Sequence, residues 1–448
     1  MYAEVDAFAG RAPVRVRVGA AAPLGWWAAV CVALVACIDR VEANLLAGAL
    51  SQVQEEFGFG DAAAGAIPTA SAVAGILLLI PAGRLADTGR RGRIIAGVVA
   101  VWAVLTLGSG LATGYAMLFA LRVALGGAGQ LYNPPASSLL ADYFPPGSRA
   151  RAFGLERAGY FTGLPIGVLA GGALAEAFGW RLAFVLIAVP GLVVALLCLT
   201  IREPVRGIGD HIGRLQQRTA PAVHQEIEPD ATPVPQQIRQ LLRIRTLRVV
   251  VAGLTIMFFG LGGLYFWMPS FYQRRYDLDE AAAAAVTGGV GLVGIVLGML
   301  LGSRLGDRYH GRRPGWRLTL GGTALFVGTA GLAGSLLMPA LAAQSALYLV
   351  ANAGFSAAIP NLTAANADIV PAHRRGMGFA VLQLVVTLGG AAGPWLIGLA
   401  SDATGSLTEA FAVLLVPLGI GAWVIVRGRR HFDADVQAAT TAAPPVPR

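Results

Sequence analysis

The chain has 448 residues, of which 56% are hydrophobic and only 13% are charged. A soluble globular domain carries about 25% charged residues, so this composition excludes a soluble protein of this length. The formal net charge is +9, and all 34 of the Lys and Arg residues are Arg. They gather in polar stretches between apolar ones, as in the cytoplasmic loops of a membrane protein, so we do not expect nucleic-acid binding.

Twelve apolar stretches are each long enough to cross a hydrocarbon core of about 30 Å. They lie at residues 24–50, 62–83, 94–114, 116–141, 151–177, 180–201, 247–273, 280–304, 317–338, 340–366, 376–402 and 406–427. The predicted fold is an all-α membrane protein in which twelve transmembrane helices form two pseudo-symmetric six-helix bundles. The first stretch is full length and no small-residue cleavage site precedes it, so we expect an uncleaved helix rather than a signal peptide.

The arginines predict how the chain is oriented in the membrane. Arg-rich segments precede the first span and follow the second, fourth, eighth and tenth, whereas the opposite loops hold only Arg181, Arg274 and Arg275. Under the positive-inside rule, both termini are expected in the cytoplasm. We therefore expect an integral protein of a bacterial-type cytoplasmic (inner) membrane, surrounded by membrane lipids.

The spans and polar stretches divide the chain into five predicted regions. These are a cytoplasmic tail at 1–23, a first bundle at 24–202, a cytoplasmic linker at 203–246, a second bundle at 247–428 and a disordered cytoplasmic tail at 429–448. The linker is rich in proline and then in arginine. Its second part is either a short amphipathic helix on the anionic leaflet or an ordinary basic loop.

The two bundles repeat one another in sequence. The segment DYFPPGSRARAF, which starts at Asp142, matches DIVPAHRRGMGF, which starts at Asp368, 226 residues later. Pro134 and Pro360 keep the same offset, and GRLADTGRRGR after the second span is echoed by GSRLGDRYHGRR after the eighth. Several matches at one offset indicate a duplication, and a duplicated six-plus-six architecture is typical of secondary transporters.

The loop after the second span carries a signature formed by Gly83, Leu85, Asp87, Arg90 and Arg91. With its second copy, it resembles the signature of the major facilitator superfamily. Several further features are similar to the spinster-type lipid transporters of that superfamily: the Asp39–Arg40 pair, the segment GFGDAAAGAIPTA, Arg122, the segment REPVRG and the segment FWMPSFYQRR.

This resemblance spans essentially the whole chain. It implies alternating access, coupling to protons and a lysophospholipid- or sphingoid-like substrate. It also implies that the energy comes from the proton gradient rather than from a bound cofactor. In one respect the chain departs from the pattern, because Gly129 stands where the spinster-type transporters have a Glu in the fourth span.

Four candidate proton-coupling residues are Asp39, Arg40, Glu42 and Arg122. A charge at bilayer depth costs about 2.5–3.5 kcal/mol on insertion scales, so such residues usually face a partner or a water-filled path. We predict that Asp39 accepts the proton, that Arg122 is its fixed counter-charge, and that Glu42 replaces the acid missing at position 129. The alternative is a self-compensating cluster that only stabilises packing.

Candidate substrate-binding residues come from helices expected to line a central cavity. They are Arg122, Gln130, Tyr132 and Asn133 in the first bundle and Phe259, Tyr265, Trp267, Asn352, Phe355, Asn361 and Gln383 in the second. The cavity-facing spans of the second bundle hold no charge at mid-depth. An amphiphile suits this division, because a sugar needs more hydrogen-bonding side chains and a di-acid more fixed cations.

Candidate conformational-switch residues lie in the duplicated loops: Gly83, Asp87, Arg90, Arg91, Arg149, Asp307, Arg374 and Arg375. We expect Asp87 to face the start of the eleventh span and Asp307 the start of the fifth, where a carboxylate also gains from the helix dipole. Such contacts favour a state closed on the cytoplasmic side. The alternative is that these charges only set the topology.

Three smaller interpretations complete the sequence analysis. The spaced glycines and proline of the fifth and eleventh spans favour close helix contact and resemble an antiporter motif. Glu156 and Arg157 are interpreted as an interfacial pair near the cytoplasm, or else as a gate. The three cysteines are interpreted as packing residues, and we expect no metal site.

The sequence therefore predicts a proton-coupled secondary transporter, working as a monomer on a lipid-like or hydrophobic small molecule. The first alternative is a proton-driven efflux pump for hydrophobic drugs or organic anions. A second alternative, from another class, is a non-transporting membrane sensor. We do not expect an enzyme, and no nucleotide-binding loop of the Walker type is present.

Overall fold

The computed structural model describes residues 2–8, 12–17, 20–217, 234–309, 313–371 and 375–441. The chain divides into two compact units. Unit 1 comprises Met1–Phe59, Ala70–Gln225 and Asp279–Ala284, and unit 2 comprises Gly60–Thr69, Glu226–Leu278 and Ala285–Arg448. Each unit therefore includes a short segment from a helix that continues in the other unit.

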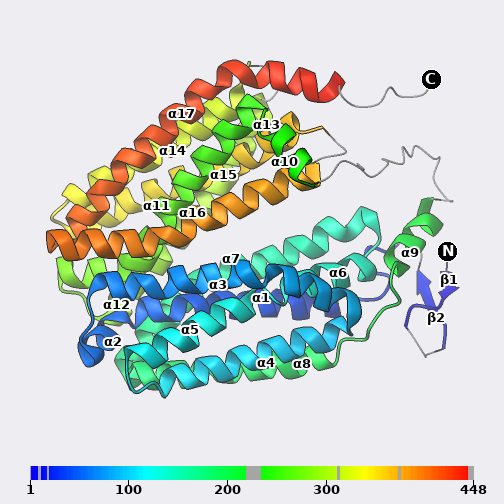
Figure 1. The fold of residues 1–448 in the computed structure, drawn as a ribbon, viewed down its shortest axis with the longest axis horizontal. Coiled ribbons are helices and arrows are strands. Elements are labelled where there is room, and N and C mark those ends of the chain that lie inside the picture. The colour runs from blue at the N-terminus through cyan, green and yellow to red at the C-terminus, as the bar shows by residue number, and fades with distance from the viewer. Residues whose placement is uncertain are drawn as a thin grey trace. The chain divides into compact units, whose positions relative to one another are not determined.

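Unit 1 is built from helices that run roughly side by side (Figure 1). They are α1 (Trp27–Gly48), α2 (Leu50–Phe57), α3 (Asp61–Thr88), α4 (Arg91–Gly110), α5 (Tyr115–Gly129), α6 (Asn133–Tyr143), α7 (Pro146–Phe178), α8 (Trp180–Leu199) and α9 (Ile208–Gln217). The ten-residue segment Gly60–Thr69, which contains the start of α3, belongs to unit 2.

Unit 2 holds the remaining helices. They are α10 (Val234–Leu241), α11 (Arg245–Tyr276), α12 (Glu280–Ala285), the π-helical turn η1 (Val286–Val290), α13 (Gly291–Tyr309), α14 (Trp316–Leu337), α15 (Leu341–Ile369), α16 (Arg375–Thr404) and α17 (Leu407–Thr441). α12, η1 and α13 follow one another without a break and form one predicted span, of which the first turn belongs to unit 1.

Within the described ranges, nine helices are long and apolar enough to cross a membrane. They coincide with nine of the twelve predicted spans, and the all-α membrane class is confirmed. The other three predicted spans correspond to α1, to the α5–α6 pair and to α15. α1 carries three ionisable residues. The span predicted at 116–141 is interrupted between Gly129 and Asn133, because Pro134 and Pro135 cannot donate the backbone hydrogen bonds of a continuing helix.

α1 and α7 pack along their whole lengths through glycines. Gly159, Gly163, Gly167 and Gly171 recur every fourth residue on α7, so they share one helix face. A Cβ atom at any of them would come closer than 3.0 Å to a backbone carbonyl of α1. The backbones of the two helices therefore touch directly, as the small-residue spacing predicts.

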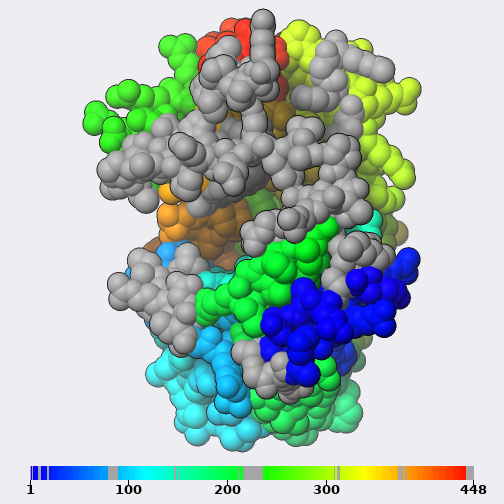
Figure 2. Space-filling model, turned by 90° about the vertical axis from the view of Figure 1, so that its right-hand side faces the viewer, coloured from blue at the N-terminus to red at the C-terminus, as the bar shows by residue number. Residues whose placement is uncertain are grey.

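Residues 2–8 and 12–17 form structure that the sequence did not predict. Strands β1 (Tyr2–Val5) and β2 (Val14–Arg17) pair antiparallel, with Tyr2 opposite Arg17 and Val5 opposite Val14. Beyond β1, Phe8 bridges to Pro204 after α8, and its ring lies 6.3 Å from that of Tyr143. Figure 2 shows these strands, in blue, against the green α9. The hairpin thus covers one end of unit 1 rather than forming a free tail.

The C-terminal region also differs from the prediction. α17 continues as a helix to Thr441, well beyond the end of the last predicted span at residue 427. In this extension, Asp435 accepts the backbone N–H of Thr246 at 2.9 Å and Asp433 accepts that of Gly315 at 3.3 Å. These carboxylates cap the starts of two other helices of unit 2, which explains why the extension is ordered.

Candidate functional site

Asp39 and Arg40 form an ion pair on α1 in unit 1. Arg40 donates to Asp39 Oδ2 from Nη2 at 2.5 Å and from Nε at 2.8 Å. The Arg40 guanidinium also lies over the ring of Tyr160 on α7, with its carbon 4.8 Å from the ring centroid. A cation over an aromatic face is attracted to it, so α7 helps to hold Arg40 beside Asp39.

Glu42 and Arg122 form a second, more deeply buried charged group. Their side chains are 1% and 3% exposed, and Arg122 Nη1 donates to the Glu42 backbone carbonyl at 3.0 Å. The Arg122 guanidinium carbon lies 4.3 Å from the centroid of the Phe184 ring on α8. Arg122 therefore contacts Glu42, and the direct Asp39–Arg122 pair expected from helix depth is not formed in this conformation.

Several polar atoms of this second group are unsatisfied. Nε and Nη2 of Arg122 make no hydrogen bond among the described residues, whereas the Glu42 carboxyl interacts with the Thr106 hydroxyl and with the Arg122 charge. Leaving a buried polar atom unpaired costs about 1–3 kcal/mol, and more when the group is charged. Groups in this state are poised to take up a proton, a water molecule or a charged ligand group.

The space next to Asp39 matches the position of the missing acid. A Cβ atom at Gly129 would lie 3.4 Å from Asp39 Oδ1, so a longer side chain there would contact Asp39. Gly129 ends α5, and the break before α6 presents Gln130 and Asn133, with Asn133 Nδ2 donating to Gln130 Oε1 at 3.2 Å. Helix breaks at membrane depth commonly mark the binding sites of transporters.

Tyr132 lies in the same break but is largely buried. Its ring packs edge-on against Trp102 of α4, with the centroids 5.2 Å apart. The side chain is only 2% exposed. In this conformation Tyr132 closes the wall behind the break rather than opening into a cavity.

Glu156 lies in the first two turns of the candidate span Arg151–Phe178, which starts where the sequence predicts it. Helix α7 itself begins earlier, at Pro146. The side chain of Glu156 is 7% exposed and pairs with Arg157 Nε at 3.3 Å. Glu156 is therefore a buried acid of unit 1, and its interpretation with Arg157 as an interfacial pair or a gate stays a prediction.

Unit 2 has a neutral polar network at a comparable place in its bundle. Tyr265 on α11 donates its hydroxyl to Asn352 Oδ1 on α15 at 2.6 Å, and Asn352 Nδ2 donates to the Tyr348 carbonyl at 2.8 Å. Asn352 and Tyr348 are fully buried, whereas Tyr265 is half-buried. Among the predicted binding residues of unit 2, the structure brings Tyr265 and Asn352 together.

Three other predicted binding residues of unit 2 contact only protein. Trp267 Nε1 donates to the Pro394 carbonyl at 2.8 Å, and Asn361 Nδ2 donates to the carbonyls of Gly302 and Ala357, both at 2.9 Å. Phe355 is fully buried. These residues pack the bundle in this conformation.

Two predicted binding residues of unit 2 keep more exposure. Phe259 is half-buried, and Gln383 is exposed, with its Nε2 donating to Thr387 Oγ1 at 3.2 Å. Tyr265, Phe259 and Gln383 are thus the more accessible of the predicted binding residues of unit 2, and their role in binding stays a prediction.

Most of the predicted switch residues lie outside the part of the chain that is described in detail. This holds for Gly83, Asp87, Asp307, Arg374 and Arg375, so the contacts expected for the two aspartates stay predictions. Arg90 is exposed. Arg149 Nε donates to the backbone carbonyls of Ala141 and Phe144, both at 3.1 Å, so it fixes the turn between α6 and α7.

Arg91 is fully buried and lies at the centre of an ionic cluster in unit 1. It pairs with Asp142 on α6 and, at 2.8 Å, with Glu203 after α8. It also donates to Ser138 Oγ at 3.0 Å and to the Pro204 carbonyl at 3.1 Å. Arg91 therefore ties three segments of its own unit together, a role that the switch prediction did not include.

The same pair recurs in unit 2. Arg317, at the start of α14, pairs with Asp368, at the end of α15, at 3.2 Å. Both residues stand 226 positions after their counterparts Arg91 and Asp142. The repeat seen in the sequence is thus a repeat of contacts, and extending its offset to Arg317 would have revealed this pair.

The cysteines and the metal expectation need little comment. Cys31 and Cys198 are buried, Cys37 is half-buried, and all three are free thiols. Over the residues described, no group of three His, Cys, Asp or Glu side chains could hold a metal ion.

Comparisons with known proteins agree with this architecture. The family model described as Major Facilitator Superfamily matches residues 32–350 and 289–447. Two solved structures of a bacterial homolog of the human lysosomal transporter Spinster, both inward-facing, share the fold. The unoccupied one has a TM-score of 0.74 and 24% identity, covering 94% of this chain and 98% of that one. The occupied one has a TM-score of 0.71 and 22% identity.

Curated relatives include transporters of different kinds. Protein spinster of Drosophila melanogaster is 26% identical over 63% of this chain, but the match spans only 47% of that protein. The cis,cis-muconate transport protein of Acinetobacter baylyi is 27% identical, over 85% of this chain and 88% of its own length. An MFS-type efflux pump of Mycolicibacterium smegmatis is 27% identical over 86% and 85%.

The family match covers nearly the whole chain, and the relatives and solved structures are transporters rather than enzymes. Spinster-type proteins are among them, as the sequence motifs indicated. The chain belongs to the major facilitator superfamily of membrane transporters.

Proposed function

We propose that this protein is a proton-coupled secondary transporter that moves a lysophospholipid- or sphingoid-like amphiphile by alternating access. The observation that carries the proposal is the group of four ionisable residues inside unit 1: Asp39, Arg40, Glu42 and Arg122. Glu42 and Arg122 are almost fully buried, and two nitrogens of Arg122 make no hydrogen bond among the described residues. Such groups within a membrane protein are expensive and are usually retained for transport.

In the proposed cycle, the carboxylates carry the proton and the arginines stay charged. A carboxylate that takes a proton loses its attraction for a neighbouring guanidinium, whereas Arg is effectively always protonated. Protonation of Asp39 would release Arg40 from its ion pair. The unpaired nitrogens of Arg122 would then be available, together with Arg40, to hold an anionic headgroup.

The neutral polar and aromatic residues of unit 2 suit the apolar part of an amphiphile. Tyr265, Phe259 and Gln383 offer aromatic surface and a few hydrogen bonds but no fixed charge. The substrate class itself is what the motif resemblance to spinster-type lipid transporters implies, and proteins named for spinster are among the relatives of this chain. The energy source in this proposal is the proton gradient, with no bound cofactor.

The proposal extends to the setting of the protein. We infer a monomer in a cytoplasmic membrane with both termini in the cytoplasm, on the basis of the arginine distribution. Cysteine labelling of residues in the Arg-rich loops of intact cells tests this orientation.

The function is tested with purified protein in sealed liposomes. With an imposed pH gradient, we expect uptake of a labelled lysophospholipid that collapses when a proton ionophore removes the gradient. Flux that ignores the gradient contradicts coupling, and absence of flux for every lysolipid and sphingoid tested contradicts the substrate class. Absence of flux for all small molecules favours the non-transporting sensor.

A second candidate function is the export of hydrophobic drugs or organic anions. It is favoured by the muconate and efflux relatives, whose matches cover more of this chain than the Drosophila spinster match does. Competition binding separates the two: a lysolipid that fails to displace a bound drug or aromatic di-acid would favour the second candidate.

A further inference from the structure

Each unit holds the start of a helix that otherwise belongs to the other unit. The Gly60–Thr69 segment, which opens α3, belongs to unit 2, and the Asp279–Ala284 segment, which opens the span of α12 and α13, belongs to unit 1. We propose that two acids, Asp402 and Glu176, act as latches, by which we mean that each caps one of these helix starts and holds it in its unit. Loss of the Asp402 latch releases its helix start more readily than loss of the Glu176 latch. The inference rests on the proposed alternating access for its use in transport, but not for its test.

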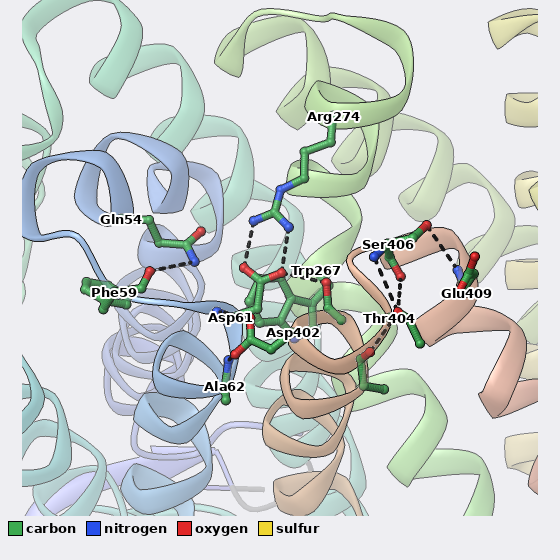
Figure 3. A network of polar contacts seen from close by, with 12 residues as sticks. Gln54, Phe59, Asp61, Ala62, Trp267, Arg274, Asp402, Thr404, Ser406 and Glu409 are labelled. Atoms are coloured by element: carbon green, nitrogen blue, oxygen red, sulfur yellow. Dashed lines mark hydrogen bonds and ion pairs between the residues drawn. The ribbon is translucent and has the colours of Figure 1, made fainter.

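The start of α3 is anchored in unit 2 by both its backbone and its side chain. Asp402, at the end of α16, accepts the backbone N–H of Asp61 at 2.9 Å and that of Ala62 at 2.8 Å. The Asp61 carboxylate in turn accepts from Arg274 of α11 at 2.6 and 2.7 Å, and from Ser401 at 2.7 Å. Figure 3 shows Arg274, Asp61 and Asp402 stacked in one chain of contacts.

Close packing reinforces this anchor. Further along α3, Thr69 Oγ1 donates to the Ala391 carbonyl at 2.6 Å. Cβ atoms at Gly65 on α3 or Gly398 on α16 would overlap the backbone of the facing helix. The Gly60–Thr69 segment therefore packs closely against α16, and Asp402 caps the helix at the start of this contact.

The start of α12 is anchored in unit 1 in the same way. Glu176, at the end of α7, accepts the backbone N–H of Ala281 at 2.8 Å. The Glu280 carboxylate accepts from Ser51 at 2.5 Å and from Gln52 at 2.6 Å. Glu176 at the end of α7 thus caps α12 as Asp402 at the end of α16 caps α3. Glu280 in the first turn of α12 also accepts side-chain hydrogen bonds, as Asp61 does in α3.

The sequence repeat shows that the two latches are one device used twice. Asp402 stands 226 residues after Glu176, the offset that relates the two halves. Asp61 and Glu280 hold the matching places at the two helix starts. A cap that arose by chance would have no reason to recur at the equivalent residue of the other half.

The two latches differ in strength for two reasons. First, α12 has a cap of its own, because Asp279 Oδ1 accepts the backbone N–H of Ala282 at 2.6 Å. The residue at the corresponding place before α3 is Gly60, which has no side chain, so the first N–H groups of α3 depend on Asp402. Second, the side-chain contact of α3 is an ion pair with Arg274, whereas that of α12 is made with neutral donors.

The latches are tested by the reactivity of buried cysteines in the full-length protein in nanodiscs. The native cysteines are first replaced by alanine. Ala64→Cys then reports the release of α3 and Ala284→Cys that of α12, since both alanines are fully buried. A maleimide reacts with each only when its segment leaves the unit, whether or not the protein transports anything.

In this assay, Asp402→Ala should raise the labelling rate at position 64 by about three- to tenfold, the effect of losing one helix cap, and leave position 284 unchanged. Glu176→Ala should raise the rate at position 284 by less than about threefold, because Asp279 still caps α12. Asp61→Asn keeps the backbone cap but loses the ion pair, and should also raise the rate at position 64.

Glu409→Ala is the matched control, because it removes an exposed acid from the first turn of α17, the helix that follows Asp402 in the chain. The proposal is overturned if Asp402→Ala leaves position 64 as protected as before, if Glu409→Ala has the same effect as Asp402→Ala, or if Glu176→Ala has the larger effect. Because labelling needs no substrate, a failure of the transport proposal leaves this result interpretable.

Discussion

The α5–α6 pair of unit 1 and α15 of unit 2 occupy equivalent places in the repeat, yet one is broken and the other is continuous. Pro134 is followed by Pro135 in unit 1, whereas the matching Pro360 is followed by Asn361. Two successive prolines remove two N–H donors, and the helix stops and restarts. In α15, the single proline is tolerated and the Asn361 amide bonds two nearby carbonyls. The difference between Pro135 and Asn361 at equivalent positions therefore accounts for a broken helix in unit 1 and a continuous helix in unit 2.

The two regions also differ in charge. Arg122 and Tyr348 stand at equivalent positions, and both are buried. Arg122 lies among Glu42, Asp39 and Arg40, whereas the surroundings of Tyr348 are neutral. The comparison teaches that unit 1 holds titratable groups at a place where unit 2 is neutral and closely packed.

The largest expected effect concerns the ionic clusters at the ends of the two units. Arg91→Met leaves two acids without their shared, fully buried cation, which should destabilise the protein by about 3–5 kcal/mol. Arg317→Met removes a partner from one acid whose side chain is 24% exposed, so the loss should be well under half of that. Thermal unfolding in detergent measures both variants. Equal losses of stability in the two variants would show that the two clusters contribute equally to the fold.

Packing of the glycine-lined helices should be alike in the two units. A larger side chain at Gly163 would collide with the backbone of Cys37, and one at Gly389 with that of Thr255. Gly163→Leu and Gly389→Leu should each cost about 1–3 kcal/mol or prevent folding. Gly154→Leu on α7 meets open space and is the control. If only the unit 1 variant is damaging, the units differ in packing as well as in charge.

Glu42 tests whether the titratable role is shared within unit 1. Glu42→Gln removes one of the groups that can bind a proton, so the pH profile of transport should change shape, with a shift of about one pH unit as a reasonable scale. Gly129→Glu in the same background adds an acid beside Asp39 and should partly restore the profile. A wild-type profile in Glu42→Gln would mean that Glu42 only packs the bundle.

The smallest effect concerns Glu56 on α2, outside the spans. Its hydrogen bonds from Arg181 and Trp180 lower the pKa of its carboxyl below the usual value. The folded state therefore holds this proton less readily than the unfolded one, so the carboxylate stabilises the fold above about pH 4.3 and loses this effect as the pH falls. Glu56→Gln should melt slightly below wild type at pH 7. A gap in melting temperature that persists undiminished at pH 3.5 would contradict this.

Much of the fold could be predicted because membrane spans follow from apolar length alone. The duplication was readable as well, since Asp142 and Asp368 keep their flanking residues. The break at Pro134–Pro135 was missed because the apolar run continues across it. The N-terminal hairpin was also missed, although the alternating VRVRV segment carries the period of a strand.

The sequence could predict which ionisable residues belong to the candidate site, but not how they pair. A charge inside an apolar span is visible in sequence, and this identified Asp39, Glu42 and Arg122. Their pairing was not predictable, because one residue of helix rotation changes the neighbour by about 100°. Arg122 consequently contacts Glu42 rather than Asp39. Trp267 and Phe355 are predicted ligand contacts that pack inside unit 2 in this conformation, and sequence cannot tell an aromatic side chain that packs from one that binds.

The most direct test of the account is proton binding by Asp39. Purified protein is mixed with a transported lysolipid in weakly buffered solution, and the protons exchanged are measured for wild type and for Asp39→Asn, with Asn352→Asp of unit 2 as a comparison. The account predicts that the substrate-linked proton signal is lost in Asp39→Asn, while lysolipid binding is still measurable. An unchanged proton signal in Asp39→Asn would contradict the claim that unit 1 carries the coupling.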